Sequence, residues 1–285
     1  MSFSQTIALG ALAGLTIYLG LPLGRLQRVS VRARVALAMF SVGILAFIFV
    51  DVLQHALIIL GDSVTRLKEH HGDVLETAGL TALLGASFMA GSAGLAVLER
   101  RLRPAGPAGP PMAGGATATL PEEAAPLVAE AEAARRHALR RGLTIAVAIG
   151  LHNFAEGLAI GVSARTGAIS LATVLIIGFA LHNATEGFGI VGPLGDVRPS
   201  WRWLGLVGLI GGGPTFVGSL LGYNVTSQPL ELAFYALAGG AILYVIGEVW
   251  QSMRRYGHRE LGLYLLGIGF MTGVVTDLLI TYGGG

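Results

Sequence analysis

The sequence contains a series of eight apolar segments, each long enough to cross a lipid bilayer. A transmembrane helix needs about 20 apolar residues. The backbone of an open strand cannot be satisfied in lipid, and the alternating pattern of barrel strands is absent. The sequence therefore predicts an all-α polytopic membrane protein with eight transmembrane helices. The segments are 5–24, 35–60, 78–98, 143–163, 168–192, 203–223, 231–250 and 260–282.

The composition agrees with a membrane protein and limits its metal chemistry. Only 13% of the residues are charged and 53% are hydrophobic, whereas a soluble domain carries about 25% charged residues. The chain has no cysteine, which excludes disulfides and thiolate metal sites. A metal ion would have to be bound by His, Asn, Asp, Glu, Met or backbone oxygen.

The basic residues predict the orientation. Every Lys and Arg except Arg66, Lys68 and Arg165 falls in a loop that follows an odd-numbered segment. The positive-inside rule places those loops in the cytoplasm and both termini outside. We therefore expect a multi-pass protein of the cell (plasma or inner) membrane. The same distribution explains the basic pI of about 9.1 without a nucleic-acid partner.

The loop between the third and fourth segments divides the chain into three parts. We expect helices 1–3 in residues 1–98, a cytoplasmic linker in 99–141, and helices 4–8 in 142–285. The start of the linker is rich in Pro, Gly and Ala, which is typical of disorder. Its end, 121–141, is rich in Ala, with acidic residues before basic ones. This order suits the helix dipole and predicts a helix that runs into the fourth span.

The same motif, Leu-His-Asn-x-x-Glu-Gly, occurs in the fourth and the fifth segments. Its His and Glu are four residues apart and share one helix face, which the Asn flanks. Ionisable residues inside a span are costly and indicate function. Two such faces turned toward each other would suit zinc, iron(II), manganese or cadmium, and are too rich in nitrogen for a dedicated calcium or magnesium site. The six polar residues are His152, Asn153, Glu156, His182, Asn183 and Glu186.

These paired motifs resemble those of the fourth and fifth helices of the ZIP (Zrt/Irt-like) family of metal transporters. The resemblance implies a ZIP-like fold with eight spans, both termini outside and a variable cytoplasmic loop after the third span. It implies a metal site at mid-membrane made by the six motif residues. It also implies a homodimer and an elevator-like motion of a four-helix transport unit against a scaffold. The transported ion would be bound in the pathway, with no prosthetic group.

The chain departs from the family pattern at several positions. Ala155 and Thr185 stand where the family usually has proline, so we expect straighter helices, or helices bent at Gly157 and Gly187 instead. In the sixth span, residues 211–214 read Gly-Gly-Gly-Pro where some members carry a carboxylate. A site for a single metal ion is therefore expected.

Two further places hold candidate metal-path residues. Asp51 and His55 share a helix face near the outer end of the second span, which fits either a metal entry or exit station or an ion pair. Glu248 in the seventh span matches an acidic family position near the cytoplasmic end. It fits either a contact with the path or a pair with a nearby Arg.

The function that follows is transport of a divalent transition metal cation toward the cytoplasm, with zinc ahead of iron, manganese and cadmium. An intramembrane zinc hydrolase would place a base beside the first His, and Asn153 and Asn183 cannot act as one. We therefore expect no enzyme. A haem or other metal-binding membrane protein is a further alternative, disfavoured by the glutamates coupled to each His. Both a channel and a carrier are compatible with the pattern.

Overall fold

The computed structural model describes residues 1–25, 30–102, 121–191, 194, 197–254 and 256–282. In these ranges every regular element is a helix, and eight helices are long and apolar enough to cross a membrane. The prediction of an all-α protein with eight spans is confirmed. The spans are Phe3–Gly20, Val31–Lys68, Val74–Leu98, Glu132–Thr166, Ile169–Val191, Trp201–Tyr223, Gln228–Gln251 and Arg259–Leu279.

The first and third crossings are each built from short consecutive elements, and the others are single helices. The third crossing contains a π-helical turn, η2 (Ala90–Gly94), and a 3-10 turn, η1 (Leu21–Arg25), follows the first. The α-helices are α1 (Phe3–Leu15), α2 (Ile17–Gly20), α3 (Val31–Lys68), α4 (Val74–Met89), α5 (Leu95–Leu102), α6 (Pro121–Thr166), α7 (Ile169–Val191), α8 (Trp201–Tyr223), α9 (Gln228–Arg254) and α10 (Arg259–Tyr282).

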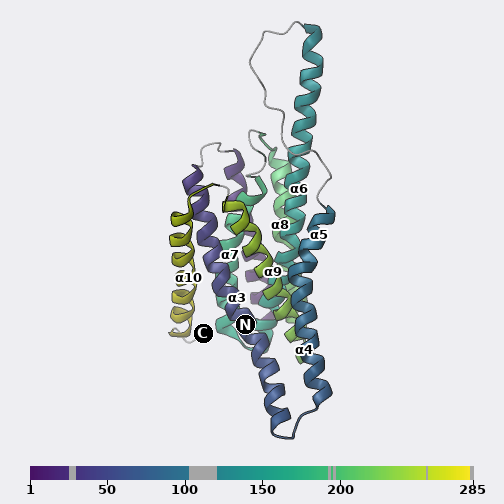
Figure 1. The fold of residues 1–285 in the computed structure, drawn as a ribbon, viewed down its shortest axis with the longest axis vertical. Helices are drawn as coiled ribbons and strands as arrows, with labels where there is room; N and C mark the ends of the chain where they lie inside the picture. The colour runs from purple at the N-terminus through teal and green to yellow at the C-terminus, as the bar shows by residue number, and fades with distance from the viewer. Residues whose placement is uncertain (26–29, 103–120, 192–193, 195–196, 255, 283–285) are drawn as a thin grey trace.

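Helix α6 extends well beyond the rest of the bundle (Figure 1). It runs from Pro121 to Thr166 without interruption, so the Ala-rich end of the linker continues directly into the fourth span. The Pro- and Gly-rich start of the linker lies outside the described residues. Both motif-bearing helices, α6 and α7, are uninterrupted across their motifs.

Polar N-caps mark where several of the apolar helices begin. The side chains of Ser2, Ser30, Asp73 and Ser200 each accept a hydrogen bond from a backbone N–H in the first turn of the helix that follows. Such caps satisfy backbone donors that have no partner inside the helix. The loop polarity therefore fixes the helix starts, and the apolar runs fix their lengths.

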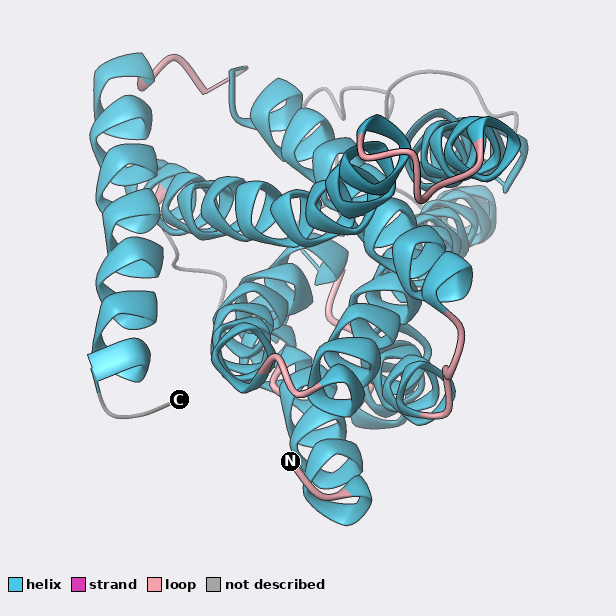
Figure 2. Ribbon diagram, turned by 90° about the horizontal axis from the view of Figure 1, so that it is seen from below, coloured by secondary structure: helices cyan, strands magenta, loops and turns pink. Residues whose placement is uncertain are grey.

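The helices pack in two groups. The first helix group is α1, α2, α6, α7 and α8; the second helix group is α3, α4 with η2 and α5, α9 and α10. The two groups meet chiefly where α3 and α10 contact α7 and where α9 contacts α6. Helix α10, which leads to the C-terminus, lies at the edge of the bundle and packs mainly on α3 (Figure 2).

Glycines bring helix backbones into direct contact inside each group. A Cβ at Gly157 of α6 would collide with the backbone of α8 at Thr215, and a Cβ at Gly187 of α7 with the backbone of α2 at Ile17. In the second group, α3 and α10 approach in the same way at Gly43 and Gly269. Small residues allow this close packing in membranes. The last residue of each motif therefore serves to dock its helix within the first group.

The boundary between the groups is packed differently. Gly178 of α7 faces α3, but the neighbouring atoms belong to the side chains of Ile44 and Ile48. Among the described glycines, none meets the backbone of the other group. Each group is thus joined internally by backbone contacts, whereas side chains fill the boundary between them.

Candidate metal centre

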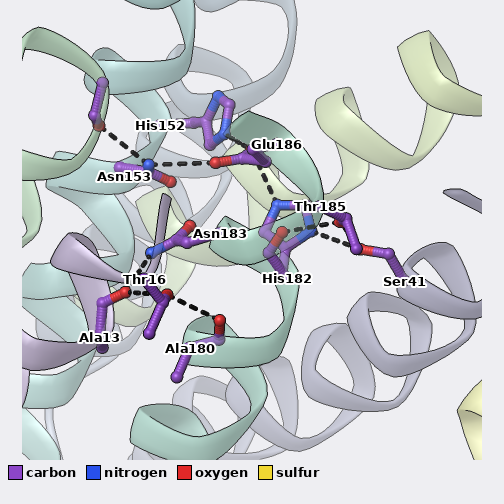
Figure 3. A network of polar contacts seen from close by, with 11 residues as sticks. Ala13, Thr16, Ser41, His152, Asn153, Ala180, His182, Asn183, Thr185 and Glu186 are labelled. Carbon is purple, nitrogen blue, oxygen red and sulfur yellow. Dashed lines mark hydrogen bonds and ion pairs between the residues drawn. The ribbon is translucent and has the colours of Figure 1, made fainter. Parts of the chain in front are cut away.

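The two motifs face each other across the interface between α6 and α7. These helices are joined by a two-residue turn, so they run antiparallel and in contact. All six polar side chains of the motifs are buried, with Glu186 the most exposed at 7%. Figure 3 shows His152, Glu186 and His182 converging on one place.

Glu186 lies between the two imidazoles. Its Oε1 is 2.5 Å from Nε2 of His152 and 2.8 Å from Nε2 of His182. The contact with His182 has the distance of an ion pair but not the direction of a hydrogen bond. The amide of Asn153 donates to the other carboxylate oxygen, at 3.1 Å. One carboxylate therefore gathers three polar side chains from both motifs.

A second cluster overlaps the first. His152, Glu156 and His182 each offer a ligand atom, and these atoms lie within 4.8 Å of one another. Both carboxylate oxygens of Glu156 are buried without a hydrogen-bond partner. An unpaired buried polar group costs about 1–3 kcal/mol, and a charged one costs more. A cation beside the two imidazoles would give these oxygens the partner that the described protein groups do not supply.

The amide groups of the two motif asparagines are each held through nitrogen, and their oxygens have no hydrogen-bond partner among the described residues. Nδ2 of Asn153 donates to the carbonyl of Gly211 in α8 at 2.9 Å, and Nδ2 of Asn183 donates to the carbonyl of Ala13 in α1 at 3.0 Å. Both Oδ1 atoms are buried without a partner. The first helix group thus uses backbone carbonyls to fix each amide, with its oxygen free to bind a cation.

Two hydroxyl groups lie beside His182, Ser41 from the second helix group and Thr185 from α7 itself. Ser41 Oγ in α3 lies 2.8 Å from Nδ1 of His182. Thr185 Oγ1 is positioned to donate to Ser41 Oγ at 2.8 Å and to the His182 carbonyl at 2.7 Å. Sequence reasoning missed Ser41, although a hydroxyl in an otherwise apolar span was a usable signal. It treated Thr185 only as a missing proline.

The donor set suits a borderline divalent ion. Two imidazoles, two carboxylates and two amides are buried on α6 and α7. Zinc prefers nitrogen and carboxylate ligands in tetrahedral geometry, and iron(II) and manganese accept the same donors. No described residue at α8 adds a further carboxylate, since the segment 211–214 contributes a backbone carbonyl instead.

A family model described as "ZIP Zinc transporter" matches residues 116–247, a range that contains both motifs. Over this range the chain is similar to the ZIP family. It is 31% identical over 150 residues to a zinc transporter ZupT of Clostridium perfringens, covering 50% of this chain and 51% of that relative. It is 29% identical over 247 residues to a zinc transporter ZupT of Corynebacterium efficiens, covering 85% of this chain and 83% of the relative. The match thus spans about half the length of the first relative. The family and both names point to a transporter rather than an enzyme.

Asp51 and His55 do not join the motif cluster. His55 Nδ1 lies 3.0 Å from the backbone carbonyl of Asp51 and 3.9 Å from its carboxylate. Since a carbonyl only accepts, Nδ1 carries the proton and Nε2 is left as a possible ligand. Asp51 is ten residues from Ser41 along α3, or about 15 Å at 1.5 Å per residue.

Two acidic residues that sequence reasoning did not connect with this pair lie close to it. Glu231 of α9 interacts electrostatically with His55, and Asp277 of α10 with Asp51. They come from helices far away in sequence, so only the fold brings them together. Asp51 and His55, with these two acidic residues, therefore form a polar cluster in the second helix group that is separate from the motif cluster.

Glu248 lies far along α9 from the Asp51–His55 pair. It is in α9, thirteen residues from Tyr235, whose ring is 5.8 Å from that of His55. At 1.5 Å per residue the separation along α9 is about 20 Å. Glu248 is partly buried and interacts with other groups. Its part in the metal path stays a prediction.

Proposed function

We propose that this protein carries a divalent transition metal ion, zinc foremost, across the membrane toward the cytoplasm through the motif cluster. The observation that supports this most is the pairing of two buried imidazoles with two buried carboxylates, one of which has no hydrogen-bond partner for either oxygen among the described residues. Such a set is stable only with a cation or bound protons. The names of both relatives support zinc as the substrate.

Each motif residue receives a role in this proposal. His152 and His182 bind the ion through imidazole nitrogen, and Glu156 and Glu186 supply the charge that neutralises it. Asn153 and Asn183 add neutral oxygens. The ion is the transported substrate, so its binding must be reversible, and the protein holds no prosthetic group.

The two helix groups support a carrier in which the first group moves against the second. Backbone contacts at glycines keep the first group together as a unit. The boundary is filled by side chains, which can repack as the helices slide. The six motif residues would move with the first group, whereas Ser41, which contacts His182, would stay with the second.

The remaining candidates are proposed as stations on the path. Asp51 and His55, with Glu231 nearby, would receive the ion at the predicted outer end. Glu248 would lie at the predicted cytoplasmic end. A homodimer would form through exposed apolar surface of the second helix group. The third crossing, Val74–Leu98, offers such a surface, because its most apolar stretch is only 11% buried.

The test is metal uptake by purified protein in metal-free proteoliposomes, screened with zinc, iron(II), manganese, cadmium and cobalt. We expect zinc uptake, with a loss of about tenfold or more for Glu156→Gln and Glu186→Gln, since mutation of metal-site groups costs about 10–100-fold. Glu69→Gln is the matched control, because Glu69 is an exposed helix cap. Wild-type uptake by both variants would show that the ion does not use this cluster. No uptake of any ion would exclude transport.

A further inference from the structure

A cavity of about 420 Å³ opens at the end of the bundle where α9 stops and α10 starts, beside the first turns of α3. Its volume is in the range of small-molecule sites, about 300–1,000 Å³. Its lining comes entirely from the second helix group and includes none of the six motif residues. Its lining residues include Val35, Met39, Arg254, His258, Arg259 and Leu263.

The cavity has a basic side. Arg254 ends α9 and Arg259 begins α10, and both are exposed. The turn between them passes through Gly257 at φ 74°, a backbone conformation that glycine adopts without strain. This tight turn puts both guanidinium-bearing residues on one cavity. Within the described part of the chain, no acidic side chain forms an ion pair with either of them.

The other side of the cavity is apolar. Val35 and Met39 of α3 are almost fully buried beneath it. Leu263 of α10 is 46% exposed and lies one turn beyond Arg259. The lining therefore changes from charged to apolar along α10, as a phospholipid changes from headgroup to acyl chain.

The position fits a membrane surface. All three helices cross the bilayer by length and composition, and the cavity lies at the ends of these spans. Trp250 also lines it, and tryptophan is enriched at the level of the headgroups. The distribution of Lys and Arg predicts that this end is cytoplasmic, where the leaflet carries anionic lipid.

We propose that this cavity binds an anionic phospholipid, with its phosphate on Arg254 and Arg259 and an acyl chain against Met39 and Leu263. Arginine pairs with phosphate through two parallel hydrogen bonds, and basic pockets between transmembrane helices bind such headgroups. The apolar half of the lining favours a lipid over free phosphate. The site clamps α3, α9 and α10, so the lipid stabilises the second helix group independently of metal binding.

The experiment measures lipid binding to the full-length protein in detergent, by native mass spectrometry and by thermal unfolding. Phosphatidylglycerol, phosphatidylcholine and inorganic phosphate are titrated in parallel. We expect phosphatidylglycerol to bind about tenfold or more tightly than phosphatidylcholine, a difference of about 1.4 kcal/mol. We also expect it to raise the unfolding temperature. Inorganic phosphate that competes equally well would show a free-anion site and overturn the lipid assignment.

Variants locate the site. Arg254→Ala with Arg259→Ala should abolish the preference for phosphatidylglycerol, whereas Arg202→Ala, an exposed arginine at the start of α8, should keep it. If the double variant does not fold, the single change Arg259→Gln at the exposed first residue of α10 should weaken binding severalfold. Equal binding of both lipids by the wild type, or an unchanged preference in the arginine variants, would refute the proposal.

Discussion

Ser41 Oγ of α3 lies 2.8 Å from Nδ1 of His182 in α7. The contact joins the motif cluster to the second helix group, across a boundary otherwise filled largely by apolar side chains. The ring nitrogen that a metal-binding His does not use for the ion is commonly held by such a hydrogen bond, which fixes the tautomer and the orientation of the ring. Ser41 is therefore a positioning residue for His182.

Ser41→Ala should weaken zinc binding about tenfold, the lower end of what loss of such a supporting group costs. Isothermal titration calorimetry on the purified protein measures this. Ser63→Ala is the matched control, because Ser63 is buried in the same helix and bonds Thr77 instead of a motif residue. Equal affinities in the two variants would mean that Ser41 does not position His182.

Glu156 and Glu186 should differ in what they contribute to stability. Glu156 has two buried oxygens without a partner, so Glu156→Leu should stabilise the protein in chelator by about 1–3 kcal/mol. Glu186→Leu should destabilise it, because three side chains lose their common acceptor. Both variants should lose zinc binding. Thermal unfolding in chelator separates them, and an equal shift in the two variants would contradict the assignment.

The glycine that ends each motif should be intolerant of a side chain. A Cβ at Gly157 or Gly187 would meet the backbone of a neighbouring helix, so Gly157→Ala and Gly187→Ala should each cost about 1–3 kcal/mol through overpacking. Gly189→Ala is the control, since open space surrounds that position. The measurement is the unfolding temperature in detergent. A harmless Gly187→Ala would mean that α7 and α2 do not pack this closely.

Acid should weaken zinc binding. The ligands bind the ion as neutral imidazole and ionised carboxylate, so protons compete with zinc. Binding isotherms between pH 7.5 and pH 5.5 should show a rising dissociation constant. Uptake that increases as the pH falls on the predicted outer side would instead indicate that protons drive the transport step.

Asp51 and His55 should affect capture more than turnover. Because they lie about 15 to 21 Å along α3 from Ser41, Asp51→Asn and His55→Gln should raise the KM for zinc uptake and leave kcat near the wild-type value. Initial rates over a range of zinc concentrations measure both constants. A fall in kcat with unchanged KM would place the pair in the transport step itself.

Much of the fold could be predicted because a membrane helix satisfies its own backbone. Each span is therefore encoded locally, in a run of apolar residues that ends at polar or basic ones. The linker was harder to interpret, because its helix α6 belongs both to the loop and to the fourth span. Neither hydropathy nor a motif in the sequence predicts the π-helical turn at Ala90–Gly94.

The eight spans and the two motif faces follow from local sequence, since a spacing of four residues puts His and Glu on one side of any helix. The groups that those faces meet depend on how the helices pack. Ser41 is 141 positions from His182, and the carbonyl of Ala13 is 170 positions from Asn183. No periodicity relates such distant residues. Their contacts arise from the close packing that glycines allow between helices. The sequence of a single segment does not specify which other helices it will meet.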